Sequence, residues 1–278
     1  MPSDTSLAPP KPESELRNFH KFLERFSSEG FHNAVAEELL KHPERLDDML
    51  GRSLVQCGSF ETGDAWHNRA ASGRSKEFEE SSDWARELVV YLAGQDQISL
   101  PDHGGALAYV DYELSPFRES GESGRNRHAA QSPITGRLDA LMTSCSEEHR
   151  TPTIVEVKAA TDSATTLRTL IQLLAYAVEL GTPQQRTRLN SIYPGRFATH
   201  EQQPRVDLCV MKALPAEASE KARKNTEERH QKVHELCGKL LHQPATRGLI
   251  RRIIWLHPEK TDAGTFSFRH RFTCMSNP

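Results

Sequence analysis

Three charged side chains stand in stretches of the chain that are otherwise apolar, and their types suit metal-assisted hydrolysis. Asp139 lies within Gly-Arg-Leu-Asp-Ala-Leu-Met, residues 136–142. Glu156 and Lys158 lie within Thr-Ile-Val-Glu-Val-Lys, residues 153–158. Runs of this length and composition are typical of strands, where a buried carboxylate is costly unless something compensates for its charge. We therefore expect a bound cation near Asp139 and Glu156.

The spacing of these residues indicates that they share one site. Side chains two residues apart in a strand point to the same face, so Glu156 and Lys158 project side by side. The polar stretch between the two runs suits a hairpin, and pairing of the strands would bring Asp139 close to Glu156. Two carboxylates at that distance repel unless a proton or a metal ion lies between them. Mg2+ fits, because it takes one or two carboxylates and keeps water and phosphate oxygens as its other ligands.

A helix is expected after the second run. Its apolar stripe has helical spacing and consists of Leu167, Leu170, Ile171, Leu174 and Val178. Gln172 and Tyr176 are four residues apart, so they share a face beside that stripe. Gly181 is expected to end this helix, and Pro183 is expected to prevent the helix from continuing.

Together these motifs resemble those of the PD-(D/E)xK nuclease superfamily. Asp139 followed by Glu156-x-Lys158 is similar to its acidic and E-x-K elements. Gln172 to Tyr176 looks like the Q-x3-Y motif of the branch that contains RecB-type, Cas4-like and lambda-type exonucleases. The resemblance implies that the glutamine reaches back to the active site and that the tyrosine packs near the substrate.

The same resemblance implies a fold and a metal site. The fold would be α/β with a restriction-endonuclease-like core, in which a central mixed sheet is flanked by helices. Mg2+ or Mn2+ would be held by Asp139, Glu156 and the main-chain carbonyl of Val157. Lys158 would orient the attacking water or hold a phosphate oxygen as charge develops.

Further candidates lie outside these motifs. The family commonly supplies one more acidic residue from a helix before the first strand. Glu87 fits best, because it lies at the edge of the apolar face of a helix expected over residues 77–92, and Glu80 is the second choice. For either, the alternative is a solvated surface position. His67 is similar to the histidine of a G-x3-H signature that joins the metal shell in some RecB-like and Cas4-like nucleases, and a surface or capping role is its alternative.

A first strand is expected over residues 105–117, with four alternating side chains on one face: Leu107, Tyr109, Asp111 and Glu113. Glu113 is a candidate for the metal shell, and a plain position on the sheet surface is its alternative. Residues 118–133 have no periodicity and are expected to form a loop. Its basic side chains would clamp substrate phosphates, or else be solvated; they are Arg118, Arg125, Arg127 and His128.

The chain divides into three parts by composition. Residues 1–14 are rich in Pro and Ser and are expected to be a disordered tail. Residues 15–75 are expected to form an N-terminal helical region, and residues 76–278 the nuclease-like domain. Within that domain, further strands are expected over 206–214, 249–256 and 265–272, and a long helix over 216–241.

Composition indicates a globular protein with a full core. Of 278 residues, 36% are hydrophobic and 26% are charged, and neither a membrane span nor a secretory signal is expected. Five scattered cysteines, without a C-x-x-C motif, favour reduced thiols in an intracellular, cytoplasmic or nuclear setting and no iron–sulfur cluster. The net charge is only −3, but basic residues are in excess after residue 205, so one side could attract a polyanion.

These observations favour a metal-dependent nuclease that acts on nucleic acid, with DNA favoured over RNA. Two alternatives belong to other classes of protein. One is a binding module that has this fold but no catalysis, and the intact set of motif residues counts against it. The other is a protein–protein adaptor that binds a partner through its N-terminal helices.

Overall fold

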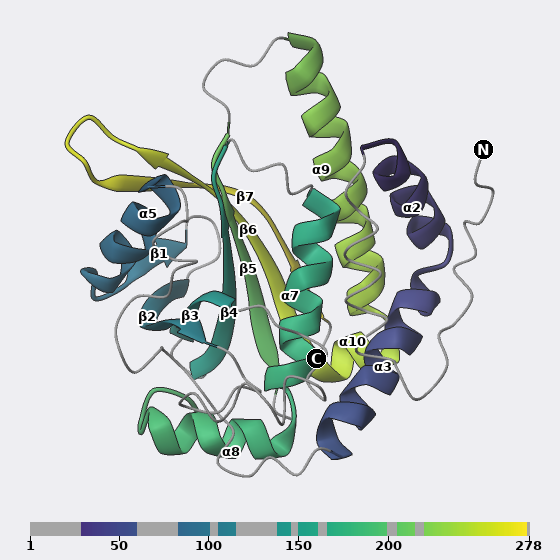
Figure 1. Cartoon of the computed structure of the whole chain (residues 1–278), viewed down its shortest axis with the longest axis horizontal. Coiled ribbons are helices and arrows are strands. Elements are labelled where there is room, and N and C mark those ends of the chain that lie inside the picture. The colour runs from purple at the N-terminus through teal and green to yellow at the C-terminus, as the bar shows by residue number, and fades with distance from the viewer. Residues whose placement is uncertain are drawn as a thin grey trace, which may run out of the picture.

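The computed structural model describes residues 29–59, 83–100, 105–114, 138–145, 150–160, 166–198, 205–214 and 220–276. These residues form an α/β fold in which a seven-stranded mixed sheet is flanked by helices (Figure 1). The strands are β1 (Ile98–Leu100), β2 (Gly105–Leu114), β3 (Leu138–Cys145), β4 (Arg150–Lys158), β5 (Val206–Lys212), β6 (Ile250–Lys260) and β7 (Phe266–Met275). The helices are α2 (Glu29–Lys41), α3 (Pro43–Ser59), α5 (Asp83–Ala93), α7 (Thr166–Leu180), α8 (Pro183–Ile192), α9 (Glu220–Leu241) and α10 (Pro244–Leu249).

The strands lie side by side in the order in which they occur along the chain. Strands β1 to β4 pair antiparallel, β4 to β6 pair parallel, and β7 returns antiparallel to β6. Each parallel step requires a crossover, which α7 and α8 supply before β5 and α9 and α10 supply before β6. The strands expected from the sequence are confirmed over their described residues, whereas the short strand β1 was not expected.

The two faces of the sheet are covered by different helices (Figure 1). Alternation along β4 sends Ile154 to one face and Val155 and Val157 to the other. The first face packs against α7, α9, α2 and α3, and the second packs against α5. We call them the α7 face and the α5 face.

Helix α7 is the central helix of its face. All of its residues except Arg168 and Gln172 are buried, although the sequence pattern indicates only one apolar stripe. The helix touches β4 and β5 on one side and α3 and α9 on the other, so even its less apolar sides are covered. A helix enclosed in this way is apolar around most of its circumference.

Two prolines begin helices in this structure. Pro183 lies in the first turn of α8, and the Thr182 hydroxyl accepts a hydrogen bond from the Gln185 N–H at 3.3 Å. Pro43 likewise begins α3. A proline in the first turn is favourable because the N–H that it lacks would have no partner within the helix. Pro183 was expected only to stop the preceding helix, so the sequence pattern missed α8.

Helices α2 and α3 belong to the main hydrophobic core. Val35 and Leu39 of α2 and Leu46 and Leu50 of α3 lie in one cluster with α7 and α9. Their apolar faces are therefore already used for packing within the chain. The expected tail, residues 1–14, and the helical pattern over residues 16–26 lie outside the described residues. Within the described ranges, no helix has the length and apolarity needed to cross a membrane.

A buried ionic cluster joins β3, β5 and β6 near the start of β4. The carboxylate of Asp207 is fully buried and accepts hydrogen bonds from Arg251 at 2.6 and 2.9 Å and from Arg252 at 2.7 Å. The Ser144 hydroxyl donates to the same carboxylate at 2.5 Å. Two guanidinium groups therefore compensate one buried carboxylate, and the cluster ties together strands that are distant in sequence.

Replacement of Asp207 by Asn should destabilise the fold strongly, because Arg251 and Arg252 would lose the buried carboxylate that they share. We expect the free energy of unfolding in urea to fall by about 3–5 kcal/mol. A matched control is Glu259→Gln, which breaks the exposed ion pair with Arg269 and should cost less than about 1 kcal/mol. Equal effects of the two substitutions would contradict a stabilising role for the cluster.

Candidate active site

The hairpin of β3 and β4 places Asp139 beside the E-x-K stretch. Ala140 pairs with Val155, so the next positions in this antiparallel register are Asp139 and Glu156. The Asp139 carboxylate also accepts a hydrogen bond from the backbone N–H of Val157 at 2.7 Å. Both acidic residues have the same alternation as Leu141 and Ile154 of the α7-face cluster, so they lie on the α7 face.

Glu156 and Lys158 form an ion pair at the carboxyl end of β4. The Lys158 ammonium donates to the Glu156 carboxylate. The side chain of Glu156 is 1% exposed, whereas that of Lys158 is 13% exposed. Glu156 is therefore almost fully withdrawn from water, and Lys158 lies between it and the surface. A buried carboxylate needs such a counter-charge, because desolvation strongly disfavours an isolated charge.

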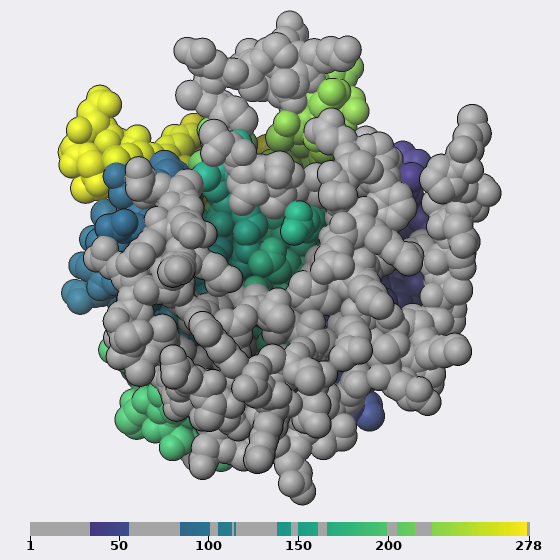
Figure 2. All heavy atoms as spheres, viewed as in Figure 1, coloured from purple at the N-terminus to yellow at the C-terminus, as the bar shows by residue number. Residues whose placement is uncertain are grey.

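Helix α7 brings the Q-x3-Y residues to the same place. The Gln172 side-chain amide donates to the Tyr176 hydroxyl at 3.3 Å. Burial raises the pKa of Tyr176 well above its usual value, and the nearby charges of Glu156 and Asp139 raise it further. The phenol therefore lies close to both carboxylates and stays protonated at neutral pH. In Figure 2, teal atoms from the β3–α7 part of the chain reach the surface near the middle of the side of the molecule shown.

Glu87 does not join this group. Its carboxylate accepts from the ammonium of Lys260 at 2.5 Å, and both side chains are more than 40% exposed. The neighbouring Leu88 packs with Val155 and Val157 on the α5 face, whereas Asp139 and Glu156 lie on the α7 face. The expectation that Glu87 is a metal ligand is therefore corrected. The amphipathic pattern located the buried side of the helix but not the sheet face against which it packs.

A register shift in β2 changes one expected face. Tyr109 pairs with Met142, but Asp111 pairs with Leu141, so the strand bulges at Val110. Tyr109 and Asp111 consequently do not share a face, contrary to strict alternation. Asp111 is buried, and its carboxylate accepts from the Tyr193 hydroxyl at 2.7 Å.

Glu113 can be placed only by its backbone. It lies between Tyr112 and Leu114, which pair with Ala140 and Leu138, so its position in β2 is opposite Asp139. Its side chain is outside the described residues. The other candidates on unplaced segments are likewise outside them: His67, Glu80, Arg118, Arg125, Arg127 and His128.

The structure adds residues that the sequence pattern missed. Glu179 is a buried carboxylate one turn beyond Tyr176, and its charge contributes to the raised pKa of that phenol. Lys212 ends β5 and is the register partner of Lys158. Its position after a buried strand was visible in the sequence, but the parallel pairing that aligns the two lysines was not.

The expected metal site has two candidate carboxylates among the described residues, and its metal stays a prediction. Within the described ranges, no three or more His, Cys, Asp or Glu side chains gather as ligands for a metal ion. Mg2+ needs only one or two carboxylates and completes its shell with water. Asp139 and Glu156 would supply these carboxylates. Val157 contributes its N–H to Asp139, and a role for its carbonyl stays a prediction.

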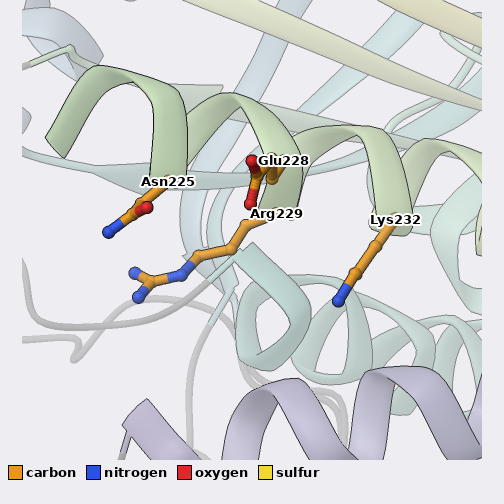
Figure 3. A pocket seen from close by; sticks show the side chains of 4 residues that line it. All are labelled: Asn225, Glu228, Arg229 and Lys232. Atoms are coloured by element: carbon orange, nitrogen blue, oxygen red, sulfur yellow. The ribbon is translucent and has the colours of Figure 1, made fainter. Parts of the chain in front are cut away.

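A cavity of about 140 Å³ on α9 is separate from these residues. It is lined by Asn225, Glu228, Arg229 and Lys232, and Figure 3 shows all four projecting from this one helix. The Lys232 ammonium donates to Glu37 of α2 at 2.7 Å. The cavity therefore lies beside an exposed contact between α9 and α2, and it contains none of the motif residues.

No known protein-family model matches this chain, and no solved structure matches its fold. The functional conclusion therefore depends on the geometry and chemistry of the site.

The raised pKa of Tyr176 makes folding stability sensitive to alkaline pH. The unfolded chain ionises this phenol near the ordinary tyrosine pKa of 10.0, whereas the folded chain keeps it protonated. Its contribution is therefore full below pH 10 and is lost as pH rises above it. From about pH 9 to pH 11, wild type should lose about 1.4 kcal/mol more stability than Tyr176→Phe. Urea unfolding of both proteins at the two pH values tests this, and parallel losses would contradict it.

Proposed function

We propose that this protein is a metal-dependent nuclease that hydrolyses phosphodiester bonds, with DNA as the favoured substrate. The observation that carries the proposal is the meeting of Asp139, Glu156 and Lys158 on one sheet face beside Gln172 and Tyr176. These five residues come from three separate elements. Their types are the ones that the PD-(D/E)xK resemblance assigns to a single site.

The order of the elements supports a restriction-endonuclease-like core. The first motif residue lies on β3, the E-x-K stretch lies on the antiparallel neighbour β4, and the Q-x3-Y pair lies on the helix that follows. Strand β5 then returns parallel to β4. This is the mixed sheet flanked by helices that the resemblance implies.

The carboxylates suit the binding of a divalent cation. Glu156 is buried and Asp139 is held by the Val157 N–H, so neither carboxylate needs a large rearrangement to present an oxygen. When bound, Mg2+ or Mn2+ would lower the pKa of a coordinated water and neutralise charge on the phosphate. A fixed pair of ligands reduces the entropy lost when substrate and metal come together.

Lys158 has a different part in this chemistry. Its ammonium pairs with Glu156 and is more exposed than that carboxylate, so it can exchange this partner for a phosphate oxygen or an attacking water. A cation in this position stabilises the negative charge that develops in the transition state. Gln172 and Tyr176 orient one another, and the protonated phenol can donate a hydrogen bond toward the carboxylates.

Cleavage assays on variants test the proposal. Labelled single-stranded and double-stranded DNA and RNA would be incubated with Mg2+ or Mn2+, with EDTA as the metal-free arm. We expect wild type to cleave DNA only with metal. Asp139→Asn, Glu156→Gln and Lys158→Met should each lower the rate by about 10²–10³-fold, as the loss of one group that stabilises the transition state typically does.

Glu87→Gln is the matched control, because this carboxylate lies on the α5 face and should leave the rate unchanged. Circular dichroism would verify that each variant is folded. Wild-type activity in Lys158→Met would refute the assignment of that residue. Metal-independent binding of nucleic acid without cleavage would instead support a binding module on the same fold.

A further inference from the structure

Two lysines end neighbouring parallel strands on the α7 face. Lys158 of β4 and Lys212 of β5 are register partners, so their side chains leave the sheet in the same direction. Adjacent strands are separated by about 4.8 Å, which sets the distance between the bases of the two side chains. The row of charged groups at this edge therefore continues beyond the ion pair of Glu156 and Lys158. Ligands of open α/β sheets commonly bind outside the carboxyl ends of such strands.

His257 of β6 holds the end of β5 in place. Its Nδ1 lies 2.8 Å from the carbonyl oxygen of Lys212, and His257 is 3% exposed. Since a carbonyl can only accept, Nδ1 carries the proton and donates to it. This hydrogen bond fixes the backbone from which the Lys212 side chain leaves.

His230 of α9 covers His257. The two rings are stacked with centroids 5.4 Å apart, and the indole of Trp255 lies 5.7 Å from His230. Both His230 and Trp255 are buried, and within the described part of the chain neither His230 Nε2 nor Trp255 Nε1 makes a hydrogen bond. Two buried ring nitrogens without a described hydrogen-bond partner therefore lie near the end of β5, whereas buried polar groups usually have one.

The two imidazoles add little positive charge to this area at neutral pH. Burial lowers the pKa of His230 to about 4, with the neighbouring His257 and the charge of Lys212 acting in the same direction. Burial is also the main cause of the lowered pKa of His257. Both rings are therefore neutral at pH 7, and the ammonium of Lys212 lies close to them.

We propose that Lys212 binds a phosphate of the nucleic-acid strand next to the one held at Asp139 and Glu156, with His257 as its positioning residue. The proposal rests on the proposed function and extends it, because it names the part of the substrate that lies over β5. An ammonium group binds phosphate as a point charge, and lysines at the ends of two neighbouring strands favour a polyanion over a single small anion. His257 would act through the backbone of Lys212 and would not touch the substrate.

Binding measured as a function of salt tests this proposal. A short labelled DNA would be titrated, in Mg2+, against the cleavage-impaired Asp139→Asn protein with and without Lys212→Met. Loss of one phosphate contact should weaken binding and reduce the slope of log affinity against log salt by about 1. Lys212→Arg should keep the slope, because it keeps the charge. Lys260→Met, which removes an exposed lysine paired with Glu87, is the control and should also keep it.

The positioning role of His257 has its own test. An Asn side-chain amide can replace the Nδ1–H donor, whereas Leu cannot. His257→Asn should therefore keep the salt slope, and His257→Leu should lower it while the protein stays folded by circular dichroism. An unchanged slope in both would remove His257 from the proposal.

The outcomes separate the two proposals. If the Asp139→Asn protein binds no nucleic acid and wild type cleaves none, the proposed function fails, and the role of Lys212 fails with it. If wild type cleaves DNA but Lys212→Met leaves binding and salt slope unchanged, only the role of Lys212 is overturned. In wild-type background, Lys212→Met should raise KM more than it lowers kcat.

Discussion

The site depends on one constraint, which is that carboxylates withdrawn from water must be compensated. Glu156 is almost fully buried between Val155 and Val157, and a charge in such a place is tolerated only with a partner. Lys158 is two residues away on the same face and supplies that partner. Asp139 meets the same requirement through the Val157 N–H on the neighbouring strand. The hairpin of β3 and β4 therefore builds the site and satisfies its charges together.

Buried carboxylates near the two ends of β4 are compensated by different partners. Near its start, the carboxylate of Asp207 is surrounded by Arg251 and Arg252, so cations are in excess there. Near its end, the Glu156 carboxylate pairs with the Lys158 ammonium, and the Asp139 carboxylate accepts a hydrogen bond from the Val157 N–H. The first arrangement is complete in itself and stabilises the sheet. The second places two carboxylates on neighbouring strands next to a lysine, which is the arrangement that the proposed metal site requires.

Local patterns predicted which candidate side chains lie together where these are close in sequence or share one element. Period-two spacing within β4 fixes the relation of Glu156 to Lys158, and helical spacing fixes that of Gln172 to Tyr176. Glu87 shows the limit of such patterns. A hydrophobic stripe reveals that a helix has a buried side, but it does not reveal which face of the sheet that side covers. The bulge at Val110 was invisible for a related reason, since it depends on pairing with a partner strand.

What the sequence determined by itself was therefore a set of short-range relations, because alternation and helical periodicity act within a few residues. It determined the strands other than β1 and the central helix, and it indicated that Glu156 is buried among apolar residues. Only the tertiary structure decided that Glu87 lies on the opposite face and that Pro183 begins a helix. It alone aligned Lys212 with Lys158 and stacked His230 on His257. Those relations join residues that are far apart in the chain, and packing of the whole sheet sets them.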